Sequence, residues 1–129
     1  MGNTEQKCTI LLAEDEVAVR NLVRRVLERE GFRVLEAENG RVAVDVADRY
    51  PDEIQLFLTD VVMPELSGPR AAARITAHRP TTAVLYMSGY AEGEISESGE
   101  LQPGIRLLEK PFSPTTLLEW VRESLRNIG

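Results

Sequence analysis

The sequence predicts an α/β domain built on a parallel sheet with helices on both faces. Short apolar runs alternate with helical stripes five times, and the connections between them are short. Repeated strand–helix units of this kind form parallel sheets. Most of the apolar runs are continuous, which is typical of strands buried on both faces. The 129 residues fit one domain that can bury a core without disulfides.

Five apolar segments are the predicted strands. In chain order they are residues 8–13, 32–35, 54–58, 83–87 and 105–108. The first, third and fourth are nearly all apolar, as central strands of a doubly wound sheet are.

Two helices are predicted in the first half of the chain. Apolar residues recur at helical spacing over 19–27, and Gly31 ends that helix. The second helix begins near Asn39-Gly40 and stops before Pro51.

The second half contains two clear helices and one weak one. Residues 68–79 form the third helix, and about 114–127 form the last, where Pro114 suits the first turn. Residues 91–104 contain three glycines, one proline and few apolar positions. They predict only a short or frayed fourth helix.

The composition limits the classes of function. There are 21 acidic against 15 basic residues, so binding to nucleic acid or to anionic membranes is not expected. Cys8 is the only cysteine, which suits a reducing cytoplasm. Residues 1–7 form a polar segment without the apolar core of a signal peptide, and no apolar run approaches the ~20 residues of a membrane span. We therefore expect a cytoplasmic protein whose folded domain spans 8–128.

Polar side chains follow four of the predicted strands at the point where each strand ends. They are Glu14 and Asp15 after the first strand, Asp60 after the third, Ser88 after the fourth and Lys110 after the fifth. In a parallel sheet these positions share one edge, where ligands of open α/β folds bind. One edge therefore gathers three carboxylates, a hydroxyl and an ammonium.

This set of groups predicts phosphoryl chemistry around a divalent cation. Three adjacent carboxylates repel unless a cation lies among them. Oxygen ligands without His or Cys favour Mg²⁺, and Mn²⁺ can substitute. A carboxylate beside such an ion can attack a phosphoryl group to give an acyl phosphate. Lys110 would neutralise charge on that group, and the Ser88 hydroxyl would donate to one of its oxygens.

Each polar group also has an ordinary structural explanation. Asp15 is a suitable N-cap for the first helix, and Asp60 precedes a turn that contains proline. Ser88-Gly89 is a common turn pair, and Lys110-Pro111 fits a solvated loop. Only their joint placement at one edge favours the chemical interpretation.

Four segments resemble the receiver domains of two-component response regulators. They are Leu11-Leu12-Ala13-Glu14-Asp15-Glu16, Thr59-Asp60-Val61-Val62-Met63-Pro64 with Ser67-Gly68, Met87-Ser88-Gly89-Tyr90, and Glu109-Lys110-Pro111-Phe112. The match covers residues 9–126 in order and with fitting spacing.

The resemblance implies a flavodoxin-like (βα)5 fold with strand order 2-1-3-4-5. It implies Asp60 as the phospho-acceptor, Ser88 and Lys110 as phosphoryl contacts, and a cis peptide bond between Lys110 and Pro111. The donor would be a phosphohistidine on a sensor histidine kinase or a histidine phosphotransfer domain.

The resemblance also implies a metal site and a type of parent protein. The ligands of the Mg²⁺ would be Glu14, Asp15, Asp60 and the main-chain carbonyl of Val62. The stretch 99–112 is more similar to receivers attached to hybrid histidine kinases than to those fused to DNA-binding modules.

Three positions depart from the usual receiver pattern. Leu107 stands where Tyr or Phe is usual, so we expect Ser88, residues 88–93 and Tyr90 to carry the change to the face of helix four, strand five and helix five. Val62 lies two residues after the acceptor, and Tyr90 lies two after Ser88. Neither side chain is a carboxylate or amide that orients a water molecule, so we expect slow self-hydrolysis and no other turnover.

The same residues argue against three other classes of protein. A flavin-binding protein of this fold would need a phosphate loop rich in Gly, Ser or Thr where Glu14 and Asp15 stand. An aspartyl phosphatase commonly carries an Asp where Val62 stands. The remaining alternative is a degenerate receiver that acts as a phosphorylation-independent scaffold, and the presence of all five site residues argues against it.

Trp120 lies off the apolar stripe of the last helix, about 110° from its centre. It is expected either in a partner surface formed by helix four, strand five and helix five or at the edge of the core.

Overall fold

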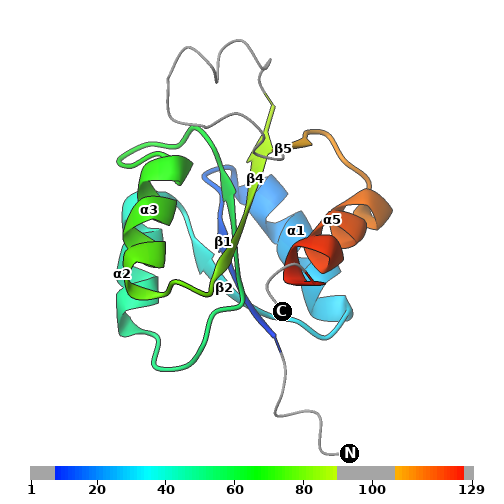
Figure 1. The fold of residues 1–129 in the computed structure, drawn as a ribbon. Helices are drawn as coiled ribbons and strands as arrows, with labels where there is room; N and C mark the ends of the chain where they lie inside the picture. The colour runs from blue at the N-terminus through cyan, green and yellow to red at the C-terminus, as the bar shows by residue number, and fades with distance from the viewer. Residues whose placement is uncertain (1–7, 90–106, 127–129) are drawn as a thin grey trace, which may run out of the picture.

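The computed structural model describes residues 8–89 and 107–126 (Figure 1). In these ranges the strands are β1 Thr9–Ala13, β2 Arg33–Ala37, β3 Leu56–Asp60, β4 Ala83–Ser88 and β5 Leu107–Glu109. They form one parallel sheet in the order β2-β1-β3-β4-β5. The predicted flavodoxin-like arrangement is therefore confirmed.

Helices cover both faces of this sheet. Those in the described ranges are α1 Val17–Arg29, α2 Gly40–Arg49, α3 Gly68–His78 and α5 Pro114–Arg126. Figure 1 shows α1 and α5 on one face and α2 and α3 on the other. The predicted segment 91–104 and its fourth helix lie outside the described residues. None of the helices in the described ranges has the length and apolar character needed to cross a bilayer.

The burial of β1 explains why its sequence is continuously apolar. All five of its residues are buried. Ile10 and Leu12 pack in the core beneath α1 and α5, whereas Leu11 and Ala13 pack in the core beneath α2 and α3. Because successive side chains of a strand point to opposite faces, a central strand needs apolar residues at every position.

Local signals set where the helices begin and end. The Asn39 side chain accepts a hydrogen bond from the Val42 N–H at 2.8 Å and caps α2. The chain leaves α1 through Gly31, whose φ of 95° favours glycine. The capping role considered for Asp15 is wrong, because Glu16 occupies the N-cap of α1 and makes no side-chain capping bond.

Four strands end later than predicted. β2 continues to Ala37, β3 spans Leu56–Asp60, β4 continues to Ser88, and β5 continues to Glu109. Asp60 and Ser88 are thus the last residues of their strands and do not follow them. The reason is that main-chain pairing is insensitive to side-chain polarity, so Asp60 still pairs with Met87 and Ser88 with Glu109.

Trp120 is half-buried and packs against the core beneath α1 and α5. This contact agrees with the edge-of-core interpretation, whereas helix four of the alternative partner surface lies outside the described residues.

Gly68 holds α3 tightly against the end of β3. A Cβ atom added to Gly68 would lie 2.0 Å from the Asp60 carbonyl oxygen, so backbone would have to shift. We predict that Gly68→Ala lowers the free energy of unfolding by about 1–3 kcal/mol, measured by urea denaturation.

Gly89→Ala is the matched control, because a Cβ at Gly89 would meet its nearest atoms, in Lys110, at 3.9 Å. Equal unfolding free energies for Gly68→Ala and the wild type would contradict the close contact.

Candidate functional site

A cavity of about 720 Å³ opens at the carboxyl ends of β1, β3 and β4. Every residue predicted for the metal and phosphoryl site lines it: Glu14, Asp15, Asp60, Val62, Ser88 and Lys110. Leu107 does not reach this cavity and packs instead against the core beneath α2 and α3. Tyr90, the other residue considered for the switch, lies outside the described residues. The structure therefore brings together residues spread over almost the whole chain.

Glu14 is the most enclosed member of the site, with 0% of its surface exposed. Its N–H donates to the Ala37 carbonyl at 3.1 Å, and its own carbonyl accepts from the Arg20 guanidinium at 2.8 Å. One carboxylate oxygen accepts from the Glu16 N–H at 2.9 Å, and the other lies 2.8 Å from Lys110 Nζ. Each polar group of Glu14 therefore has a partner, as buried polar groups require.

Lys110 joins Glu14 to the predicted acceptor. Its Nζ atom lies 2.7 Å from Asp60 Oδ1 as well as 2.8 Å from Glu14 Oε1. Asp60 is only 4% exposed. The ammonium thus bridges two buried carboxylates that would otherwise repel each other. The Lys110–Pro111 peptide bond is cis, as the resemblance to receivers implied.

The charges of these groups are strongly coupled. Burial, together with the adjacent Glu14 carboxylate, raises the pKa of Asp60 to about 8 despite Lys110. Burial also acts to raise the pKa of Glu14, but bonds to Asp60, Lys110 and the Glu16 N–H lower it overall. Without a cation, the pair therefore keeps a proton on Asp60 near neutral pH while Glu14 stays ionised.

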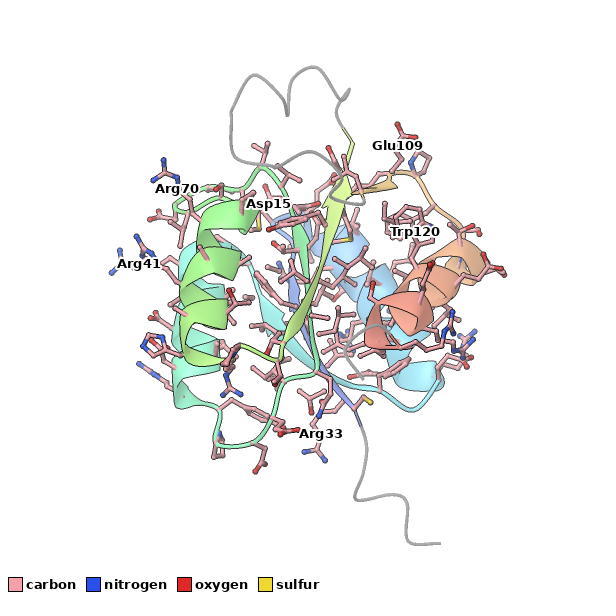
Figure 2. All side chains as sticks on the ribbon, viewed as in Figure 1. Asp15, Arg33, Arg41, Arg70, Glu109 and Trp120 are labelled. Carbon is pink, nitrogen blue, oxygen red and sulfur yellow. The ribbon has the colours of Figure 1, made fainter. Side chains whose placement is uncertain are left out.

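Asp15 supplies a third carboxylate at the same edge of the sheet. Its side chain is exposed, and Figure 2 shows it at the upper end of the molecule. One carboxylate oxygen from each of Glu14, Asp15 and Asp60 lies within 4.8 Å of the others. An all-oxygen group of this size is the donor set that Mg²⁺ prefers.

The loop between β3 and α3 is held at both ends. The Val61 N–H donates to the Met87 carbonyl at 3.0 Å, and the Gly68 N–H donates to the Val61 carbonyl at 2.8 Å. Between them the Leu66 N–H donates to the Pro64 carbonyl at 2.7 Å around Glu65, whose φ is 72°. These are features of a strained γ-turn. The loop keeps Val62 at the cavity, where 55% of this residue is exposed.

Residues 10–122 match the sequence model of the response regulator receiver domain family. The chain belongs to this family. The receiver domain is 35% identical to "Sensor kinase CckA" of Brucella abortus over 117 residues, which are 91% of this chain and 12% of the kinase. It is 31% identical to "Response regulator receiver protein CpdR" of the same organism over 90% of this chain and 95% of CpdR. It therefore spans a small part of one relative and nearly all of the other.

Solved structures agree with this assignment. A crystal structure of the receiver domain from the hybrid histidine kinase CckA has a TM-score of 0.76 and 34% identity, and covers 91% of this chain and 98% of its own. A response regulator receiver protein from Sinorhizobium medicae has a TM-score of 0.83 and 27% identity, and covers 97% of this chain and 99% of its own. The predicted resemblance to receivers, including those of hybrid histidine kinases, is confirmed.

Sequence reasoning missed two contacts of this receiver site. The Glu16 N–H and the Arg20 guanidinium both hold Glu14. The only available signal was the position of these residues in the first turn after the acidic pair, and that signal does not reveal where a side chain reaches.

We predict that Asp60→Asn raises the melting temperature of the metal-free receiver at pH 8.5 by about 3–8 °C. The folded-state pKa of Asp60 lies above its ordinary value of 3.8. Below that ordinary value Asp60 does not destabilise the folded state, and the destabilisation grows as the pH rises to about 8. The increase in melting temperature of Asp60→Asn should therefore become smaller as the pH is lowered from 8.5 to 5.

Differential scanning calorimetry of both proteins at the two pH values measures this gain. Asp45→Asn is the control, because Asp45 is an exposed carboxylate on α2. A gain that is the same at both pH values would contradict the coupling between Asp60 and Glu14.

Proposed function

We propose that this receiver accepts a phosphoryl group on Asp60 from a phosphohistidine, with Mg²⁺ bound beside it, and relays the change to a partner in the cytoplasm. The observation that carries the proposal is the position of Asp60. It lies buried in an open cavity, 2.7 Å from the Lys110 ammonium and within 4.8 Å of two further carboxylates. An acceptor for a phosphoryl group needs these three features together: access, a cation site and a fixed positive charge.

The donor set fits the proposed ion. Oxygen atoms of Glu14, Asp15 and Asp60 and the main-chain carbonyl of Val62 would hold Mg²⁺ or Mn²⁺. When bound, the ion would keep Asp60 ionised and offset the charge of the phosphoryl oxygens.

The side chains of the receiver would perform the transfer as follows. One Asp60 oxygen attacks phosphorus while the bond from phosphorus to the donor imidazole nitrogen breaks, and the electron pair leaves with the imidazole. Lys110 would turn toward the phosphoryl oxygens and neutralise them. The Ser88 hydroxyl, which is buried at the same edge, would donate to another of these oxygens. Gly89 presents no side chain at the entrance.

The partner that supplies the phosphoryl group would be a sensor histidine kinase or a histidine phosphotransfer domain. A second cavity of about 300 Å³, lined mainly by apolar side chains, adjoins the site between α1 and Pro111-Phe112. It includes Leu22, which is 54% exposed. We propose that the donor protein packs here, because an apolar surface beside the acceptor fixes the approach of the imidazole.

The outgoing signal would pass from Ser88 through the following loop to the face of helix four, β5 and α5. Leu107 lies in β5 opposite Tyr86 and packs into the core, and it has no aromatic ring that could turn when Ser88 moves. The relay would then depend on residues 88–93, including Tyr90.

We predict a long-lived acyl phosphate, because Val62 lines the cavity but cannot orient a water molecule for attack. Val62→Asn should shorten its lifetime roughly tenfold, since a side-chain amide can hold that water. Val62→Ala controls for the change in size. Equal lifetimes for all three proteins, measured by loss of phosphoryl mass, would refute this explanation.

Intact mass spectrometry after incubation with acetyl phosphate tests the function itself. We expect a Mg²⁺-dependent gain of one phosphoryl group (~80 Da) in the wild type and in Asp45→Asn, and no gain in Asp60→Asn. A wild type that binds Mg²⁺ but takes up no phosphoryl group from acetyl phosphate or from a phosphohistidine protein would overturn the proposal. It would favour the alternative of a phosphorylation-independent scaffold.

A further inference from the structure

Arg20 lies outside the predicted site but bonds directly to its most buried residue. Its NH1 donates to the Glu14 carbonyl at 2.8 Å, and its Nε lies 3.4 Å from the Glu36 carboxylate at the end of β2. The Arg20 side chain is only 16% exposed. The guanidinium therefore links the loop after β1 to the edge strand of the sheet.

The peptide group between Glu14 and Asp15 is the part of the site that this bond controls. The Glu14 carbonyl belongs to that peptide group, so the bond from Arg20 fixes the plane from which the Asp15 side chain projects. No hydrogen bond or ion pair holds the Asp15 carboxylate itself within the described residues. Its position among the three carboxylates therefore depends on the backbone that carries it.

We propose that Arg20 is a positioning residue for the divalent cation: it orients the Glu14–Asp15 peptide so that the Asp15 carboxylate meets those of Glu14 and Asp60. This inference rests on the proposed function, because it concerns the Mg²⁺ bound there. Residues that orient a metal ligand through hydrogen bonds affect the metal affinity strongly even though they do not contact the ion.

Electrostatics alone predicts the opposite change in Mg²⁺ affinity when Arg20 is replaced. A guanidinium next to the acidic group repels a divalent cation, so removal of its charge would tighten Mg²⁺ binding. Removal of its orienting bond would weaken binding. The direction of the change therefore separates a positioning role from a charge effect.

The experiment is a calorimetric titration of Mg²⁺ into the wild type, Arg20→Gln and Arg24→Gln. Arg24 is the matched control, because it lies one turn further along α1 and its Nε also pairs with Glu36, at 3.3 Å, but it does not bond to Glu14. We expect the Kd for Mg²⁺ to rise about tenfold in Arg20→Gln and to change less than twofold in Arg24→Gln. At saturating Mg²⁺, the rate of phosphorylation by acetyl phosphate should return to within about twofold of the wild type, since Arg20 touches no reacting group.

Amide hydrogen exchange on the metal-free proteins tests the same claim without the ion. Exchange at Asp15 and Glu16 should become about fivefold faster in Arg20→Gln and stay unchanged in Arg24→Gln. If Arg20→Gln does not fold, Arg20→Lys replaces it with the same criteria, because a single ammonium lacks the fork that serves both Glu14 and Glu36.

Mg²⁺ affinity in Arg20→Gln equal to or tighter than in the wild type would overturn the proposal. A wild type that binds no Mg²⁺ would count against the proposed function instead. In that case the exchange rates test only the orienting bond: faster exchange at Asp15 and Glu16 supports the orientation of this peptide group by Arg20, and unchanged exchange refutes it.

Discussion

The ammonium of Lys110 between the carboxylates of Glu14 and Asp60 is the interaction on which the rest of the site depends. Two buried carboxylates at such close range are unfavourable unless a proton or a cation compensates them. Lys110 supplies part of that compensation, and a proton supplies the rest when no metal is bound. We propose that the site exchanges this proton for a divalent ion and that Lys110 then turns from the two carboxylates to the phosphoryl oxygens.

The sheet register brings these groups together. β1 pairs with β3 through Ala13 and Thr59, which places Glu14 and Asp60 at the same level. β3 pairs with β4 through Asp60 and Met87, and β4 pairs with β5 through Ser88 and Glu109. Because parallel strands end at one edge, a short polar segment after each apolar run is enough to assemble a site. Gly68 then lets α3 close against β3 without moving Asp60.

Much of this arrangement could be predicted from the sequence, because it follows from local patterns. The continuous apolar runs predict strands buried on both faces, and the polar residues after them predict one shared edge. The ends of β3 and β4 could not be placed as well, since polarity at Asp60 and Ser88 hides their main-chain pairing. The interaction of Arg20 with Glu14 was also out of reach, because a long side chain can extend in several directions and its tertiary partner decides among them.

The contrast between Asp15 and Glu14 shows how burial divides roles within one acidic pair. Glu14 is enclosed and bonded through each of its polar groups, whereas the carboxylate of Asp15 is exposed to solvent at the mouth of the cavity. We propose that Glu14 is a rigid inner ligand and Asp15 a solvent-facing outer ligand, which would suit an ion that keeps part of its water shell. The same division leaves one side of the site open to an incoming donor.

A crystal structure of the receiver with Mg²⁺ and beryllofluoride, a phosphoryl mimic, would show directly which groups hold the metal and where Lys110 lies when a phosphoryl group is present. We predict the metal among Glu14, Asp15 and Asp60, the mimic on Asp60, and Lys110 moved from the two carboxylates to the fluorides. A metal bound elsewhere, or a Lys110 that still bridges Glu14 and Asp60 with the mimic present, would contradict this prediction.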